Sequence, residues 1–254
     1  MPIASWRRYV ARGPLQRRRI VITRPRDRAE RLAGELRALG AATLVLPLVR
    51  IEATEEVSAL AAVLADLDGS DWVVFTSASG VSAVGELMTE LGAAKVAAVG
   101  PATAAALRDI GVEPSFVPGR FAAEEIVAGL EPLAGARVLL PQADLADRGL
   151  ADGLRDRGAN VSAMTAYRTV PVERTASELA ELRAADAVVL ASGSAARSLA
   201  LQGGAGDALV ACIGPKTAEI AREVGLPDGI VADEATAKGI IHALVDHFEE
   251  TTEP

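Results

Sequence analysis

Short runs of apolar residues alternate along the chain with longer segments in which apolar residues recur every three or four positions. The short runs are bounded by glycine, proline and small polar residues, which is typical of strands. They predict strands over residues 20–23, 43–47, 72–76, 96–99, 115–117, 138–140, 161–167, 187–191, 210–213 and 229–231. The longer segments predict helices, as over residues 29–39, where Leu32 and Leu36 share one face and Gly40 follows as a C-terminal cap. Because strand and helix alternate over the whole length, we expect the doubly wound α/β class with parallel sheets.

One pattern occurs twice: an apolar strand runs into a turn of small hydroxyl residues, and the next strand ends on Gly-Pro-x-Thr. The first copy covers residues 72–80 and 96–103, and the second covers 187–194 and 210–217. Each of the four turns is expected to open a helix. The first turn of a helix presents unpaired backbone N–H groups and a partial positive charge. We therefore expect these turns to bind anionic groups and to line a binding cleft.

A second repeat interlocks with the first. Residues 19–50 align without a gap on residues 137–168, and Gly40 falls on Gly158. Both copies read strand, helix, Gly-Ala, strand. The chain is therefore interpreted as an ancient duplication of an α/β unit.

The length of 254 residues favours two domains, at the usual ~100–200 residues per domain. Aromatic residues make up only 3%, so Val, Leu, Ile and Ala must fill the cores, which suits parallel strands covered by helices on both faces. One division cuts the chain near residue 130. In the other, residues 47–53 and 167–172 cross between domains, so that the middle of the chain forms one domain and the two ends form the other. The hydrophobic pattern does not choose between them.

Residues 1–19 contain six arginines and no acidic residue. We expect a frayed extension, because this segment lacks the apolar core of a secretory signal. An arginine-rich arm suits nucleic acid or an anionic membrane, but no aromatic platform or groove-reading motif accompanies it, so neither partner is predicted. The net charge is −8, and −14 without these six arginines. An acidic ligand would therefore be held locally, by helix N-termini and a few bases.

Several common catalytic motifs are absent from the sequence. It contains no Gly-x-x-x-x-Gly-Lys-Ser/Thr loop, no Gly-x-Gly-x-x-Gly turn and no Gly-x-Ser-x-Gly elbow, which weighs against nucleotide binding and serine hydrolysis. No metal is predicted, since His242 and His247 lack metal-ligand spacing in an expected amphipathic helix. Cys212, the single cysteine, is expected in an apolar core strand and suits a reducing cytoplasm. No apolar run approaches the ~18 residues of a membrane span, so we expect a soluble protein.

Six motifs taken together resemble the uroporphyrinogen-III synthase family of tetrapyrrole biosynthesis. They are Ile22-Thr-Arg-Pro25, Leu46-Pro-Leu-Val-Arg-Ile51, Val74-Phe-Thr-Ser-Ala-Ser-Gly-Val81, Val99-Gly-Pro-Ala-Thr103, Thr165-Ala-Tyr-Arg-Thr169 and Ile213-Gly-Pro-Lys-Thr217. In order and spacing the resemblance covers about residues 19–248. Two features depart from the family pattern: the basic start, and the turn at residues 190–194, which reads Leu-Ala-Ser-Gly-Ser where relatives often carry Phe-Thr-Ser.

The resemblance implies the crossed arrangement, with two α/β domains of related topology, a two-stranded hinge and an active site in the cleft between the domains. The implied boundaries are 19–48 plus 172–254 for one domain, 54–166 for the other, and 49–53 and 167–171 for the hinge strands. Residues 1–18 lie outside the resemblance and are expected to be a disordered basic extension. It also implies a cytoplasmic, monomeric enzyme that needs no cofactor. Its partner is the substrate hydroxymethylbilane, with at most a transient contact to the preceding pathway enzyme and with no nucleic-acid or membrane partner.

The implied reaction closes linear hydroxymethylbilane, which carries eight carboxylates, into uroporphyrinogen III with ring D inverted and water lost. In the family's mechanism the terminal hydroxyl leaves to give an azafulvenium cation, the last ring attacks through its substituted position, and a spirocyclic intermediate opens and recloses. The enzyme must direct this closure, because the substrate cyclises unaided to the type I isomer. Tyr167, on the second crossing segment, is expected to donate a proton or hydrogen bond to the departing hydroxyl. A structural tyrosine bridging two strands is the alternative.

Substrate carboxylates are expected to bind backbone N–H groups at the four turns, with help from hydroxyls and two cations. The candidate residues are Thr76, Ser77, Gly100, Thr103, Ser192, Ser194, Gly214, Thr217, Lys216 and Arg24. The alternative is that the hydroxyls only cap their helices and that the cations are solvated surface charges. Two other functions stay open: a non-catalytic two-lobed protein that binds a tetrapyrrole or another anionic metabolite, and an enzyme that acts on a different anionic metabolite.

Overall fold

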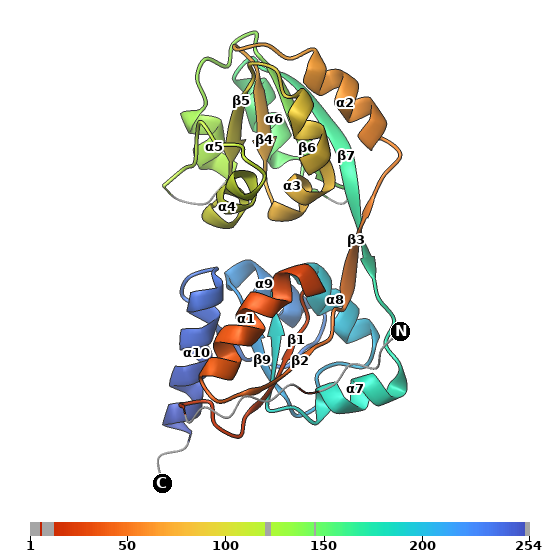
Figure 1. Cartoon of the computed structure of the whole chain (residues 1–254), viewed down its shortest axis with the longest axis vertical. Helices are drawn as coiled ribbons and strands as arrows, with labels where there is room; N and C mark the ends of the chain where they lie inside the picture. Colours follow the sequence, from red (N-terminus) through yellow and green to blue (C-terminus); the bar gives the residue numbers. More distant parts are fainter. Residues whose placement is uncertain (1–5, 7–12, 120–122, 145, 252–254) are drawn as a thin grey trace. The chain divides into compact units, whose positions relative to one another are not determined.

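The computed structural model describes residues 6, 13–119, 123–144 and 146–251 (Figure 1). Contacts among these residues divide the chain into two compact units. The first unit comprises the described parts of Met1–Arg50 and Val170–Pro254, and the second comprises those of Ile51–Thr169. The chain therefore passes between the units twice, so that the first unit is built from both ends of the chain and the second from one continuous segment.

The first unit is built on a parallel five-stranded sheet in the order β10-β9-β8-β1-β2. Its elements are β1 (Arg19–Ile22), α1 (Arg26–Ala38), β2 (Ala42–Val45), α7 (Ala176–Arg183), β8 (Ala187–Leu190), α8 (Gly193–Leu201), β9 (Leu209–Cys212), α9 (Pro215–Glu223), β10 (Ile230–Val231) and α10 (Ala237–Glu250). Helices α7, α8 and α9 cover one face, over Val21 and Val188. Helices α1 and α10 cover the other face, over Ile20 and Ile22 (Figure 1). Alternate residues of one strand thus face two separate cores.

The second unit has the same layered plan. Its elements are β3 (Val49–Ala53), which begins at the boundary with the first unit, α2 (Val57–Ala65), β4 (Trp72–Phe75), α3 (Ala78–Val84), the 3₁₀ helix η1 (Gly85–Glu90), β5 (Lys95–Ala98), α4 (Pro101–Asp109), α5 (Ala123–Gly129), β6 (Arg137–Ala143), α6 (Gly149–Asp156) and β7 (Asn160–Pro171). The strand order is β3-β7-β6-β4-β5, and β4 to β7 are parallel. Helices α2, α3 and α4 cover the face of Val73 and Leu139, and α5 and α6 cover the face of Val74 and Val138 (Figure 1).

The two sheets share one strand order when β3 is set aside. Strands β2-β1-β8-β9 of the first unit correspond to β7-β6-β4-β5 of the second. Where the first sheet continues with β10, the second has a single bridge between Ala97 and Phe116. The predicted α/β class, with parallel sheets of related topology, is therefore confirmed. None of the helices in the described part of the chain combines the length and apolar character that a bilayer crossing requires.

The strand predicted over residues 115–117 is wrong. Phe116 makes one bridge to Ala97, the Ser115 N–H donates to Val96 O at 2.7 Å, and no strand forms around these contacts. Pro114 and Pro118 flank this segment. Proline has no N–H to give to a ladder, which explains why the pairing does not extend.

In each unit an aspartate before one strand binds the start of its neighbour. Asp71 precedes β4 and accepts the N–H of Arg137 at 2.9 Å. Asp186 precedes β8 and accepts the N–H of Arg19 at 2.7 Å. Asp71 also pairs with the Arg137 guanidinium at 2.6 Å. Burial raises the pKa of the Asp71 carboxyl, but hydrogen bonds from the Asp68 N–H and from Arg137 outweigh this effect, so that its pKa lies below the ordinary value.

Residues 13–18 are a packed part of the first unit, so the disorder predicted for residues 1–18 is wrong for this stretch. Leu15 is fully buried in the core under α1 and α10, and its N–H donates to Leu39 O at 3.0 Å. A side chain at Gly13 would collide with the backbone of Leu39. One leucine in an arginine-rich segment gives no periodic signal, which is why the pattern missed it. Residues 1–5 and 7–12 of the predicted extension lie outside the described residues.

Candidate functional site

The candidate turns follow the carboxyl ends of the parallel strands in both sheets. In sheets of this class ligands bind at that edge, at the point where neighbouring connections leave in opposite directions. This point lies between β4 and β6 in the second unit and between β8 and β1 in the first. Thr76 and Ser77 follow β4, Ser192 follows β8, and Arg24 follows β1. These four residues therefore flank the position in each sheet where the fold provides for a ligand.

Ser77 and Tyr167 meet at this edge of the second unit. The Ser77 Oγ and Tyr167 Oη atoms are 2.8 Å apart. Ser77 also accepts the N–H of Gly80 at 3.0 Å and so caps α3. Tyr167 is 6% exposed and packs into the core under α2, α3 and α4, while its backbone oxygen accepts the N–H of Asp144 at 3.1 Å. The ring is thus held by packing, and the phenol oxygen is held by a hydroxyl.

This pair has an arrangement suited to proton donation. Ser77 Oγ accepts a hydrogen from Gly80 and carries one hydrogen of its own, which it can donate to the Tyr167 oxygen. Tyr167 can then direct its O–H away from Ser77. In that arrangement the phenol can release a proton while Ser77 stabilises the oxygen left behind.

The two hydroxyl turns use their central serines as helix caps. Ser192 accepts the N–H of Ala195 at 3.2 Å and caps α8, as Ser77 caps α3. Thr76 and Ser194 are exposed beside these caps. The capping interpretation therefore holds for Ser77 and Ser192, while Thr76 and Ser194 keep accessible hydroxyls.

The two Gly-Pro turns leave backbone donors uncapped. Gly100 and Gly214 are the N-caps of α4 and α9; a proline follows each, and neither helix has a side-chain cap. Since proline carries no N–H, the first donors are the N–H groups of Ala102 and Lys216, and no hydrogen bond to either occurs among the described residues. Both therefore suit an anion. Sequence reasoning treated all four turns as equivalent anion sites and missed that only the Gly-Pro turns lack a side-chain cap, although the proline in the sequence indicates it.

The threonines of the Gly-Pro turns are less accessible than expected. Thr103 is 5% exposed and Thr217 is 7% exposed. Their N–H groups close the first turn, each donating at 3.1 Å to Gly100 O and Gly214 O respectively. Lys216, by contrast, is exposed beside its turn. At these turns the uncapped amides and the lysine are better placed for a ligand than the hydroxyls.

Two arginines that sequence reasoning missed lie near the carboxyl ends of β1 and β2. Arg174 donates from Nε to Pro47 O at 2.8 Å and pairs with Glu178 at 3.6 Å. Burial lowers the pKa of the Arg174 guanidinium, Glu178 opposes this, and the nearby charge of Arg26 lowers it further. Arg26 lies two residues after Arg24 and is the first residue of α1, just after the first apolar strand, and that position is the signal that could have found it. An anion at this edge would relieve the repulsion between the arginines.

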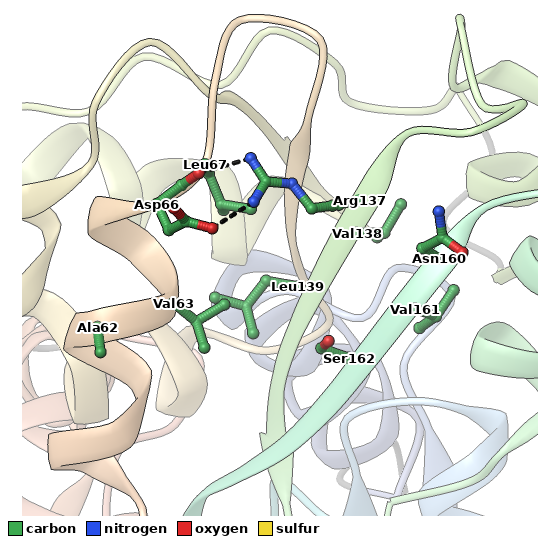
Figure 2. A pocket seen from close by; sticks show the side chains of 10 residues that line it. All are labelled: Ala62, Val63, Asp66, Leu67, Arg137, Val138, Leu139, Asn160, Val161 and Ser162. Carbon is green, nitrogen blue, oxygen red and sulfur yellow. Dashed lines mark hydrogen bonds and ion pairs between the residues drawn. The ribbon is translucent and has the colours of Figure 1, made fainter.

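Two surface hollows lie at the opposite edges of the sheets. One, of about 720 Å³, is lined by α2 and by the first residues of β6 and β7 in the second unit (Figure 2). The other, of about 590 Å³, lies at the amino ends of β8 and β9 in the first unit. No candidate residue lines either hollow.

Cys212 is 3% exposed in the core under α7, α8 and α9, which confirms the expected core position. Burial raises the pKa of the Cys212 thiol to about 11. A thiol of that kind is a poor nucleophile at neutral pH. Among the described residues, no three histidine, cysteine, aspartate or glutamate side chains form a group that could hold a metal ion.

Comparison with known proteins decides the family. A family model described as uroporphyrinogen-III synthase HemD matches residues 30–242. The chain belongs to the uroporphyrinogen-III synthase family. This confirms the resemblance carried by the six sequence motifs. Every candidate residue except Arg24 lies inside the segment that matches the uroporphyrinogen-III synthase model.

Individual members of the uroporphyrinogen-III synthase family match nearly the whole chain. The synthase of Salmonella typhimurium is 30% identical, over 89% of this chain and 99% of the relative. The synthase of Synechococcus elongatus is 27% identical, over 96% and 100%. The crystal structure of the Helicobacter pylori enzyme covers 91% of this chain and 99% of its own, with a TM-score of 0.63 at 18% identity, which shows a shared fold.

Proposed function

We propose that this chain is an active uroporphyrinogen-III synthase, which converts hydroxymethylbilane into uroporphyrinogen III with ring D inverted. The observation that carries this proposal is the family match over residues 30–242. The hydrogen-bonded pair of Ser77 and Tyr167 at a carboxyl edge supports it. Because one water molecule leaves as the ring closes, the reaction is that of a cyclising lyase.

In the proposed first step Tyr167 acts as the general acid. The carbon–oxygen bond of the terminal hydroxymethyl group breaks, and its electron pair leaves with the oxygen. Tyr167 gives that oxygen a proton, so that the leaving group departs as water, and Ser77 donates a hydrogen bond to the phenolate. The pyrrole nitrogen donates its lone pair to the remaining carbon, which gives the azafulvenium cation.

In the later steps the protein determines which carbon–carbon bonds of the substrate form and break. The substituted carbon of ring D attacks the cation and forms a spirocyclic intermediate. The bond from that carbon to its original methylene bridge then breaks, and the unsubstituted carbon of ring D bonds to the same methylene, so that ring D is inverted. That carbon finally loses its proton, which restores aromaticity and returns a proton to Tyr167. Holding the reacting ends together supplies much of the selectivity, since intramolecular effective molarities reach ~10⁵ M or more.

Substrate carboxylates are proposed to bind locally at the carboxyl edges. In the second unit the donors are the Ala102 N–H and the exposed Thr76 hydroxyl. In the first unit they are the Lys216 N–H and side chain, with Arg24 at the neighbouring turn. Local binding is required because the net charge of the chain is −8, which repels a polyanion at long range.

We further infer a cytoplasmic monomer that needs no cofactor. Every proposed step is a proton transfer or the making and breaking of carbon bonds, without net oxidation. The single cysteine is buried and cannot form a disulfide within the chain, which suits a reducing compartment. The proposed partner is hydroxymethylbilane, with no nucleic acid or membrane, and a contact with the preceding enzyme would be transient.

Product analysis tests the function. Freshly prepared hydroxymethylbilane is incubated with the protein, the products are oxidised, and the type I and type III uroporphyrins are separated by chromatography. We expect type III to dominate with native protein and type I to dominate in buffer or with heat-denatured protein. Unchanged isomer ratios would refute the synthase, and unchanged ratios together with tight binding would identify a tetrapyrrole-binding protein.

A further inference from the structure

The hollow of the second unit has a counterpart in the first unit, which is defined by the internal repeat. The hollow lies between α2 and the amino ends of β6 and β7 (Figure 2). Strands β6 and β7 correspond to β1 and β2. Helix α2 corresponds to α7, because each packs on the equivalent face of its sheet and leads into an equivalent strand, β4 or β8. The counterpart is therefore the groove between α7 and the amino ends of β1 and β2.

That counterpart groove holds an indole ring. Trp6 packs against the core that lies under α7, and its indole N–H donates to Glu181 Oε2 of α7 at 2.6 Å. The guanidinium of Arg19, the first residue of β1, lies 5.6 Å from the centre of the ring. In the repeat Arg19 aligns on Arg137, and Arg137 lines the hollow of the second unit. An arginine at the equivalent position of the repeat therefore lies at each groove.

The hollow has the other parts of an indole site. Its apolar wall contains Val63 of α2, which lies near the fully buried Leu139 of β6 (Figure 2). Ser162 lines it where the repeat places Leu44 in the first unit, so a smaller side chain leaves more room. Asp66, at the end of α2, offers a carboxylate as Glu181 of α7 does. The volume of about 720 Å³ lies within the range of small-ligand sites.

Charge around the hollow selects against an acidic ligand. Arg137 binds Asp66 at 2.5 Å and Asp71 at 2.6 Å, and Asp68 lies 3.9 Å away. Three carboxylates thus surround one guanidinium. A polycarboxylated tetrapyrrole would be repelled here, whereas a neutral ring that donates an N–H would find an acceptor in Asp66.

We propose that this hollow is a binding site for a free, uncharged indole-type compound. Its N–H donates to the Asp66 carboxylate, its face lies beside Arg137, and its edge packs on Val63. The site lies at the amino ends of the strands, away from Ser77 and Tyr167, and its existence does not depend on the proposed catalytic function.

Titration with N-acetyl-tryptophanamide, a neutral indole, tests the site. Amide shifts of the ¹⁵N-labelled full chain report the position of binding, and we expect them to centre on residues 62–67, 137–139 and 160–162 with a Kd on the order of 1 mM. N-acetyl-phenylalaninamide is the matched probe without a ring N–H. It should bind about five-fold more weakly, because one hydrogen bond is lost.

Two variants separate this site from its counterpart. Ser162→Trp fills the hollow from within and should weaken binding at least ten-fold. Trp6→Ala empties the counterpart groove and should add a second site, with new shifts at residues 19–21 and 178–182. The variant that combines Ser162→Trp with Trp6→Ala should bind the indole only at the counterpart groove. A thermal melt checks each fold, and Ala62→Trp, at an exposed residue that lines the hollow, replaces Ser162→Trp if that variant is unstable.

Three results would overturn the proposal. The first is the absence of shifts around the hollow at 10 mM N-acetyl-tryptophanamide. The second is undiminished binding in a folded variant whose hollow is filled. The third is no second site in Trp6→Ala, which would break the correspondence between the grooves.

Discussion

At the scale of single residues, the Ser77 hydroxyl has two partners. It accepts the N–H of Gly80 and shares a hydrogen with Tyr167, so it is not a free donor for a substrate carboxylate. The exposed hydroxyl of Thr76 next to it is better placed for that task. Neighbouring hydroxyls in one turn thus have different roles. Their hydrogen bonds distinguish these roles, whereas their residue types do not.

Tyr167→Phe should lower kcat for type III product by about 10²-fold or more, because a general acid contributes roughly that much. The melting temperature should change by only a few degrees, since the buried ring keeps its packing and loses one hydrogen bond. Tyr9→Phe is the matched control, with the same atom removed at the other tyrosine, and should keep the native rate. A native rate in Tyr167→Phe would end its assignment as the acid.

Cys212 should resist alkylation in the folded protein. Its pKa of about 11 means that the thiolate fraction at pH 8 is about 100-fold below that of an ordinary thiol with a pKa near 9. Iodoacetamide should therefore label it slowly in buffer and quickly in concentrated urea, as followed by mass spectrometry. Equal labelling rates in the two solvents would contradict its buried position.

At the scale of elements, the paired aspartates before β4 and β8 provide an internal comparison. Asp71 is nearly buried and holds Arg137, whereas the Asp186 side chain is 32% exposed, with Arg18 3.7 Å away. The two occupy equivalent positions and accept the same backbone N–H, so the difference between them reports the combined effect of Asp71's burial, its pair with Arg137 and its bond from the Asp68 N–H.

Asp71→Asn should lower the free energy of unfolding by about 2–3 kcal/mol at pH 7, and Asp186→Asn by less. The pKa of Asp71 is depressed in the fold, so its contribution is present above the unfolded value of about 3.9 and is lost as the pH falls through the folded value. Urea unfolding at pH 7 and at pH 3 should therefore show a difference between wild type and Asp71→Asn that shrinks in acid. A difference that grows in acid would reverse the assigned sign.

Much of the element plan could be predicted from the sequence, because both repeats carry their own periodicity. Apolar runs of four residues located the central strands of both sheets, and the Gly-Pro dipeptides marked the starts of α4 and α9. Isolated contacts could not be predicted. Leu15 is a single leucine in an arginine-rich segment and Trp6 is only partly buried, and the contacts of both depend on partners distant in sequence, such as Leu39 and Glu181.

The candidate site could be predicted in part for a similar reason. Ser77 was named from its place in the turn after an apolar strand, and Tyr167 from its place on the second crossing segment. Their 2.8 Å contact joins residues 90 positions apart and requires the sheet to form. Arg174 was missed because its position beside Pro47 depends on a pairing across 127 residues.

At the scale of the whole molecule, the second unit is one continuous segment with its own two cores. A fragment of residues 51–169 should therefore fold alone, with a cooperative thermal transition and dispersed amide resonances. A fragment of residues 1–50, which holds only the first part of the other unit, should remain unfolded, because β1 and β2 there lack β8. An unstructured 51–169 fragment would show that its cores need the rest of the chain.

The discontinuity of the first unit affects its biosynthesis. β1 lies between β2 and β8 in the sheet, and β8 is translated long after both. At 5–20 residues per second the ribosome needs roughly ten to thirty seconds to pass from one to the other. At the end of that interval the nascent polypeptide carries a completed second unit, while β1 and β2 still lack their partner strand. Premature termination between residues 171 and 187 would fix this state, leaving a half-finished sheet for chaperones and proteases to recognise.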